Sequence, residues 1–442
     1  MKLKYIFFLF TIISFSCPSF LHSQSKTSTD LTEPYSIYAG KIGQGDYLGA
    51  YLELKRHEAE YKASPQFARN YFQLMSILAS QVGEYNAANS YLDEFFSRQM
   101  KPQKDLESSP IDNFEPRGAI EVIASAAEKQ QVIMINEEHD TPMHRAFTTR
   151  LLPVLYKKGF RYLAAETIAE ADTELNKRGY PTQKTGFYTA DPVYGDMIRT
   201  ALKLGFKIVP YEHIRTDCKN PDDNEDFCQN ERERGQAQNL YDRILKNDPK
   251  AKILVHVGRG HNQEANFETW AMMAWHFKQI SKIDPYTIGQ MHLSERSRPE
   301  NEFPLYRYAT AKWKFTEPSV FQSKDGKFWS EPANDLTIFH PRAIYKDGRP
   351  TWLEMSGARK SLALYGKVEN SVAMPFLPQT GGIFLVQAFA ANEPNDAIPI
   401  DQIIVPDAKK APVLMLPAKG EFRIIAIDET GKVVVEMSVS IK

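Results

Sequence analysis

The sequence predicts an α/β fold: a mostly parallel sheet covered by helices, with a small N-terminal helical module and a C-terminal antiparallel β-sandwich. Three observations lead to this prediction. Between residues 131 and 293, short apolar runs alternate with amphipathic segments, which is typical of βαβ units. Before this region, apolar residues recur at three- and four-residue spacing. After about residue 303, alternation with a period of two replaces the helical pattern.

Length and charge limit the function classes. A chain of 442 residues is too long for one ordinary domain, so we expect units at residues 30–103, 115–298 and 303–442. The 54 basic and 55 acidic side chains give a formal charge of −1. Because no basic excess is present, we expect no nucleic-acid partner.

The first 23 residues have the pattern of a secretory signal peptide. Two lysines precede an apolar run from Tyr5 to Phe15, and small and polar residues follow it. The run is too short to span a bilayer, so we expect an exported protein, periplasmic or extracellular, without a transmembrane segment. Cys17 leaves a lipid anchor as the alternative, which is less favoured because the three residues before it match a lipidation sequence poorly.

Two cysteines, Cys218 and Cys228, remain after signal cleavage. In an exported chain, an isolated pair at this spacing favours one disulfide that closes a short loop. A metal-binding pair is the alternative, but nine intervening residues differ from the short spacing of zinc sites.

The segment at residues 30–103 is predicted to be helical and weakly repeat-like. Gly-Asp-Tyr at Gly45 and Gly-Glu-Tyr at Gly83 each precede alanine and aromatic residues at helical spacing. Such a module either binds a protein partner or caps the next domain. A linker rich in proline, serine and charge follows it.

The central unit is predicted to alternate strands and helices. Strands are expected at 131–139, 161–167, 207–212, 252–258 and 286–293, and helices at 142–160, 191–206, 230–249 and 267–281. The strands are apolar on both faces, which indicates a parallel sheet between two helical layers. In the last unit, Lys-Asp-Gly, Ala-Lys-Gly and Glu-Thr-Gly mark hairpins of the β-sandwich.

Titratable residues follow four successive strands of the predicted sheet. Ligands of parallel α/β sheets bind at the carboxyl ends of the strands, so these residues define a candidate site. His256 lies within an apolar run, which is more typical of a core histidine. His261 follows Gly-Arg-Gly, where the backbone can turn sharply. The strand-end residues are Glu137, His139, Glu166, Glu212, His256 and His261.

No other catalytic motif competes with this cluster. The chain has no Gly-x-Ser-x-Gly, no His-Glu-x-x-His and no phosphate-binding loop. Water activation by histidine and carboxylate, with or without a metal, is the chemistry that remains.

Two stretches resemble the superfamily that joins erythromycin esterases, ChaN-like haem-binding lipoproteins and Tiki proteases. They are INEEHDTPMHRAFTTRLLPVLYKKGFRYLAAET and KILVHVGRGHNQE, and the resemblance covers residues 131–295. The family's first strand ends in Gly-Glu-x-His, its second in Glu, and a later strand in Gly-x-x-His or Gly-x-Gly-His. Glu137, His139, Glu166 and His261 match these positions, whereas Asn136 replaces the usual glycine.

The resemblance implies three activities. An esterase-like hydrolase would use His139 to activate water, Glu137 or Glu166 to orient it, and His261 to bind or protonate the oxyanion. The substrate would be a small molecule or a peptide. A metal-dependent enzyme would use the same four residues as ligands of a divalent transition metal. The third activity is haem or metal binding in iron uptake, without catalysis. Polar residues of related chains also match three supporting positions, Glu212, Arg232 and Glu233.

Overall fold

The computed structural model describes residues 31–97, 103–213, 218, 224–364, 382–406 and 413–442. The predicted signal peptide and Cys17 lie outside these residues. Within them, no helix combines the length and the hydrophobicity that crossing a bilayer requires.

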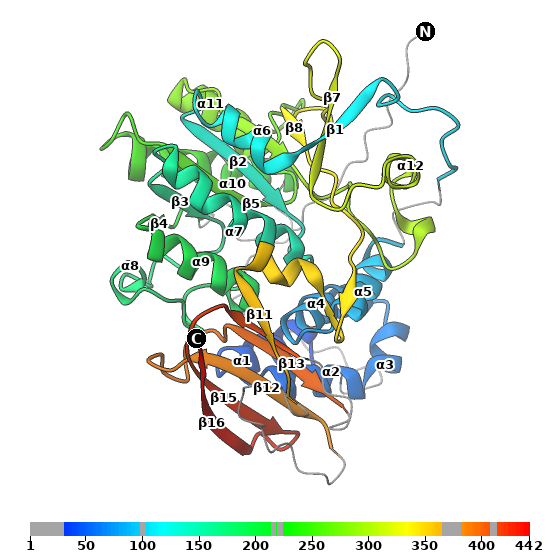
Figure 1. Cartoon of the computed structure of the whole chain (residues 1–442), viewed down its shortest axis with the longest axis vertical. Helices are drawn as coiled ribbons and strands as arrows, with labels where there is room; N and C mark the ends of the chain where they lie inside the picture. Colours follow the sequence, from blue (N-terminus) through cyan, green and yellow to red (C-terminus); the bar gives the residue numbers. More distant parts are fainter. Residues whose placement is uncertain (1–30, 98–102, 214–217, 219–223, 365–381, 407–412) are drawn as a thin grey trace.

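A six-stranded parallel sheet forms the centre of the molecule, as predicted (Figure 1). Its strand order is β4-β3-β5-β2-β6-β8. Each predicted strand of the central unit is present, and β8 is an addition at the edge. The strands are β2 (Val132–Glu137), β3 (Tyr162–Ala165), β4 (Lys207–Val209), β5 (Ile253–Gly258), β6 (Tyr286–Gly289) and β8 (Leu336–Thr337).

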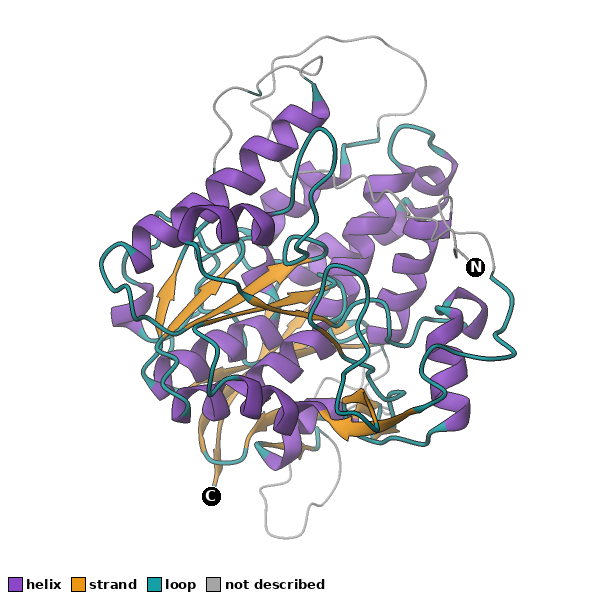
Figure 2. Ribbon diagram, turned by 90° about the horizontal axis from the view of Figure 1, so that it is seen from above, coloured by secondary structure: helices purple, strands orange, loops and turns teal. Residues whose placement is uncertain are grey.

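Helices cover both faces of this sheet (Figure 2). Alternate strand residues point to opposite faces. Ile133 and Ile135 of β2 join the core beneath one helical layer, and Val132 and Met134 join the core beneath the other. The first layer contains α6 (Ala119–Ala126), α7 (Pro142–Lys157) and α9 (Pro192–Leu204), and the second contains α10 (Glu225–Leu240), a π-helical turn (Tyr241–Leu245) and α11 (Met273–Ser281).

Two helices of the first layer start at N-cap and proline positions that can be recognised in the sequence. Asp191 caps α9 by accepting hydrogen bonds from the backbone of Val193 and Tyr194. Helix α7 starts with Pro142 after Thr141, which occupies the N-cap position. The position of Asp140 just before Thr141 and Pro142 predicts a residue near this N-cap, but its side chain is buried and makes no capping bond.

The N-terminal module consists of five helices that pack on the sheet and on the C-terminal strands (Figure 1). Gly45 and Gly83 adopt φ angles of 76° and 81°, just before the second helix of two helix-turn-helix pairs. The module shares one hydrophobic core with the sheet, so it is a cap on the α/β unit. The helices are α1 (Pro34–Ile42), α2 (Tyr47–Arg56), α3 (Glu58–Ala63), α4 (Ala68–Gln81) and α5 (Tyr85–Ser97).

The predicted boundary near residue 300 is wrong. Residues 304–312 form helix α12, although no helix was expected after residue 303. Strand β7 (Ser319–Ser323) pairs with β1 (Phe114–Gly118), and β8 joins the parallel sheet. The α/β unit therefore continues to about residue 340. A two-residue strand is too short to show a period, which explains why the sequence did not reveal β8.

The C-terminal strands form an antiparallel sheet of order β13-β12-β15-β16, as expected. A second pair, β11 with β14, contributes Leu414 and Leu416 to the core of that sheet. The predicted hairpin at Lys-Asp-Gly joins β9 (Tyr345–Lys346) to β10 (Arg349–Pro350). The other strands are β11 (Arg359–Leu362), β12 (Phe384–Ala390), β13 (Asp401–Val405), β14 (Leu414–Pro417), β15 (Gly420–Asp428) and β16 (Val433–Ile441).

Candidate functional site

The predicted site residues gather at the carboxyl ends of β2, β3 and β5. Glu137 is the last residue of β2 and is in register with Gly258, the last residue of β5. Glu166 follows β3, whose Ala165 pairs with His256. The parallel register therefore brings three strand ends to one edge of the sheet, as the sequence predicted.

Glu137 is the centre of a buried ion-pair network. Its carboxylate accepts two hydrogen bonds from Arg145, each at 2.7 Å, and lies 2.7 Å from Nε2 of His256. Burial opposes ionisation of this carboxyl, but Arg145 and His256 hold its pKa well below its ordinary value. Glu137 is therefore an anion at neutral pH, and His256 is its partner in the core.

Arg145 was not identified from the sequence, although it lies in the first turns of the helix after β2. Its guanidinium also lies 3.3 Å from Asp191, the N-cap of α9. It donates a further hydrogen bond to the backbone carbonyl of His139 at 2.7 Å. Arg145 thus fixes both the carboxylate of Glu137 and the backbone that carries His139.

His139 lies against this network with one ring nitrogen engaged. Its Nδ1 is 3.0 Å from Oε1 of Glu137. The ring stacks on Tyr188 with a centroid distance of 3.7 Å and an interplanar angle of 15°. Among the described residues, Nε2 makes no hydrogen bond, and 9% of the side chain is exposed. The open nitrogen is the one that can exchange protons with a ligand.

Gly258 provides the space for this ring. A β-carbon at residue 258 would lie 2.1 Å from Cε1 and 2.4 Å from Nε2 of His139. It would also lie 2.7 Å from Oε2 of Glu166. Any side chain at residue 258 would displace the imidazole of His139. A glycine is therefore required here, because the imidazole lies so close to the backbone.

Glu166 belongs to a second network on the other side of Gly258. Its Oε2 accepts a hydrogen bond from the backbone N–H of Gly258, and its Oε1 lies 2.9 Å from Nη2 of Arg232. Arg232 also bonds Glu212 at 2.8 Å. Burial opposes ionisation of Glu166, but His261 and Arg232 lower its pKa to about 2. Of the supporting positions, Arg232 therefore contacts the predicted site residue Glu166 directly, and Glu212 is joined to it through Arg232.

His261 contacts the second network from its far side. Its Nε2 is 3.1 Å from Nη1 of Arg232, and its Nδ1 is 2.5 Å from Glu233. A guanidinium can only donate, so Nε2 accepts in this contact and Nδ1 carries the proton. The expectation that His261 protonates an oxyanion is not supported by this geometry, because Arg232 occupies the nitrogen that would act.

Asn136, at the position of the family's glycine, has a structural role. Its Nδ2 donates to the carbonyl of Arg259 at 2.6 Å, and its Oδ1 accepts from the backbone of Gln290 at 2.8 Å. The side chain thus ties β2 to the residues that follow β5 and β6.

Alternation along the strand predicts that Glu138 and Asp140 point away from Glu137 and His139, and that His144 lies in the following helix. Glu138 lies 3.1 Å from Nε of Arg259. Asp140 is buried against the N-terminal helices; burial and the charge of Glu138 raise its pKa to about 7. His144 is a core residue whose Nδ1 accepts from the backbone of Glu138 at 3.0 Å.

The donor set does not fit a metal ion. Among the residues that the structure describes, no group of three histidine, cysteine or carboxylate side chains is arranged to hold one. The carboxylates of Glu137 and Glu166 are each engaged by an arginine. The four predicted ligands thus belong to two separate ion-pair networks.

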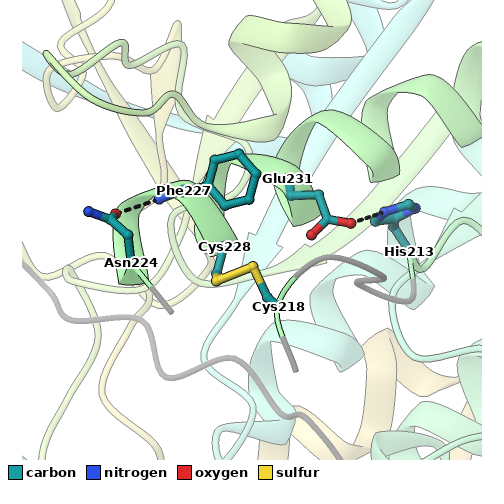
Figure 3. The surroundings of a disulfide bond; sticks show 6 residues. All are labelled: His213, Cys218, Asn224, Phe227, Cys228 and Glu231. Carbon is teal, nitrogen blue, oxygen red and sulfur yellow. Dashed lines mark hydrogen bonds and ion pairs between the residues drawn. A yellow bond between two sulfur atoms is a disulfide. The ribbon is translucent and has the colours of Figure 1, made fainter. Parts of the chain in front are cut away.

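The predicted disulfide is confirmed. Cys218 and Cys228 are bonded, with Cα atoms 5.6 Å apart (Figure 3). The bond connects the segment after β4 to the first turns of α10, where Asn224 caps the helix. Because α10 carries Arg232 and Glu233, the disulfide holds the helix that supplies the second network.

Comparison with known proteins gives no family assignment. No family model matches the chain, and no curated protein matches it. The type III effector HopBA1 is similar over 43% of this chain and 92% of its own, with 15% identity and a TM-score of 0.30. RRSP, a MARTX toxin effector domain from Vibrio vulnificus, is similar over 69% of this chain and 59% of its own, with 12% identity and a TM-score of 0.32. The C-terminal region of Pasteurella multocida toxin is similar over 79% of this chain and 53% of its own, with 9% identity and a TM-score of 0.29. Similarity at this level assigns neither family nor activity.

Proposed function

We propose that the protein is an exported hydrolase in which His139 activates a water molecule for attack on an ester, lactone or amide. One observation carries the proposal: Nδ1 of His139 lies 3.0 Å from the carboxylate of Glu137, whereas Nε2 makes no hydrogen bond among the described residues. A proton held on Nδ1 by a carboxylate leaves Nε2 as the base.

The surrounding charges suit this role. The pKa of Glu137 is well below its ordinary value, so the residue is ionised and stabilises the imidazolium that forms when His139 takes a proton. Arg145 positions both residues, since it bonds the carboxylate of Glu137 and the backbone carbonyl of His139. The resemblance to erythromycin esterases implies the same role for His139.

Hydrolysis at this site needs no reactant other than the substrate and one water molecule. The water oxygen forms a bond to the carbonyl carbon while Nε2 of His139 takes one water proton. The tetrahedral intermediate then breaks its carbon–oxygen or carbon–nitrogen bond, and the imidazolium returns the proton to the leaving group. Arg232 holds Glu166 beside Gly258, and His261 positions Arg232.

A panel of 4-nitrophenyl esters, lactones and anilides tests the proposal. We expect His139→Ala to lower kcat/KM by about 10²–10⁴, the usual contribution of a general base. Glu137→Gln should lower kcat and leave KM nearly unchanged. His57→Ala is the matched control, because that side chain is 45% exposed in α2–α3. Equal rates for the wild-type protein and His139→Ala would refute the assignment.

Haem binding in iron uptake stays the alternative prediction. It would require a Soret band when haem is added to the purified protein, and no contact in the described residues favours it over hydrolysis.

A further inference from the structure

Arg259, the residue between the two glycines after β5, is held in a strained backbone conformation. Its φ angle is 46°, in the left-handed region that non-glycine residues seldom adopt. Its N–H donates to the carbonyl of Glu137 at 2.7 Å, and its own carbonyl accepts from Asn136 at 2.6 Å. Such strain costs about 1–3 kcal/mol and is concentrated at functional sites.

The guanidinium of Arg259 is fixed at one edge and open at the other. Its Nε donates to Glu138 at 3.1 Å. Its planar group lies 5.6 Å from the ring centroids of both Phe95 and Phe96, on helix α5. Nη2 is buried without a hydrogen-bond partner, and Nη1 has none among the described residues. Nη1 and Nη2 of Arg259 therefore carry N–H groups that make no hydrogen bond within the described residues.

In the described part of the chain, Asp140 is a second buried polar side chain without a hydrogen-bond partner, and its charge interacts with that of Arg259. Its side chain is buried, and neither carboxylate oxygen accepts a hydrogen bond within the described residues. The hydroxyl of Ser76 lies beside it but donates to the carbonyl of Ala88 at 3.0 Å. The charges of Asp140 and Arg259 act on each other, yet no nitrogen of Arg259 comes within 4.0 Å of the carboxylate.

This pair of unsatisfied groups restricts the ligand that fits. A buried donor or acceptor without a partner costs about 1–3 kcal/mol, so a polar group between Arg259 and Asp140 is favoured. An anion would be repelled by Glu138 and by the carboxylate of Asp140, and it offers no donor to Asp140. A metal cation has no acceptor atom, so it would leave the free N–H groups of Arg259 without a partner. An uncharged group that both accepts and donates satisfies both residues.

We infer that Arg259 and Asp140 form a subsite for a vicinal diol in the alcohol part of the substrate, as in an acylated sugar or polyol. One hydroxyl oxygen accepts from Arg259, and the neighbouring hydroxyl donates to Asp140. Arg259 directly follows Gly258, whose α-carbon lies against His139, and Asp140 directly follows His139, so we place the diol and the reacting carbonyl in one small molecule. This inference rests on the proposed hydrolase function.

Two acetate esters test the subsite. The 6-O-acetyl ester of methyl β-D-glucoside carries the diol, and cyclohexylmethyl acetate presents a similar ring without hydroxyls. We expect the wild-type kcat/KM to favour the sugar ester by at least about 10²-fold, since sites built to hydrogen-bond a hydroxyl discriminate strongly. Arg259→Gln should bring the ratio to within about tenfold of one. Arg298→Gln, at an arginine that is 60% exposed, should retain the wild-type ratio.

Binding separates failure of the subsite from failure of the hydrolase proposal. Methyl β-D-glucoside at 100 mM should raise the Tm of the wild-type protein and of Arg298→Gln, but not that of Arg259→Gln. If both esters are hydrolysed equally, the subsite is refuted and the hydrolase stands. If neither is hydrolysed but the selective Tm shift occurs, the subsite stands and ester hydrolysis fails. No Tm shift, or an equal shift in Arg259→Gln, refutes the subsite and leaves a bound water as its occupant.

Discussion

Replacing Asp140 by asparagine should stabilise the protein, and the gain should depend on pH. Burial and Glu138 raise the pKa of Asp140 from 3.8 to about 7 in the folded protein. Below pH 4 the carboxyl is protonated in both the folded and the unfolded chain. Between pH 4 and 7 the folded protein keeps a proton that the unfolded chain releases, so stability falls as the pH rises.

The magnitude follows from the two pKa values. Each pKa unit corresponds to about 1.4 kcal/mol, so ionising Asp140 costs the folded protein about 4 kcal/mol above pH 7. Asparagine has nearly the same shape and no charge. The free energy of unfolding of Asp140→Asn should therefore equal that of the wild type near pH 4 and exceed it by about 4 kcal/mol at pH 8.

Urea unfolding of both proteins at pH 4.5, 6, 7 and 8 measures this difference. Asp396→Asn, at an exposed aspartate near the start of β13, is the matched control and should give no trend. A difference between Asp140→Asn and the wild type that stays constant across the series would show that Asp140 is ionised throughout, which would refute the reasoning.

Three further predictions address the site and its supports. Gly258→Ala should lower hydrolysis by at least about 10²-fold, because the new β-carbon displaces His139; an unchanged rate would mean that the imidazole does not act where the structure has it. Cys228→Ser should lower the free energy of unfolding by about 2–3 kcal/mol, because the bond to Cys218 is lost. A wild-type urea midpoint that reductant does not change would contradict this prediction. Tyr47→Phe should cost about 1 kcal/mol, since its hydroxyl donates to the end of η1 (Tyr188–Ala190) at 2.9 Å; a Tm equal to wild type would contradict that contact.

The parallel sheet could be predicted because its strands show the same signal throughout. All six residues of β2 and all six of β5 are buried, so neither strand shows the alternation of a half-exposed sheet. The elements after residue 303 could not be predicted equally well. Strand β8 has two residues, and its place in the sheet depends on pairing with β6, which is a long-range contact.

The candidate site also contains residues that could be predicted from the sequence and residues that could not. Glu137 and His139 could be found because a strand end and a two-residue spacing are local features. Arg145 and Arg259 are also close to the motifs, but their importance depends on which carboxylates they meet after folding. The sequence predicted a helix start for Asp140 and not its buried position, because the residues around it come from helices about 60 positions earlier in the chain.

The turn between α4 and α5 has a consequence for how this chain can change. Gly83, at its tip, leaves no room for a β-carbon, which would lie 2.6 Å from Nη1 of Arg349 and 2.9 Å from the carbonyl of Gln402. The backbone N–H of Ile404 donates to the carbonyl of Val82 in the same turn. The α4–α5 turn and strand β13 are thus interlocked, although the bonded residues Gln81 and Gln402 are 321 positions apart. Recombination that exchanged only one of these two segments would break the contact, so we expect the two segments to be exchanged together.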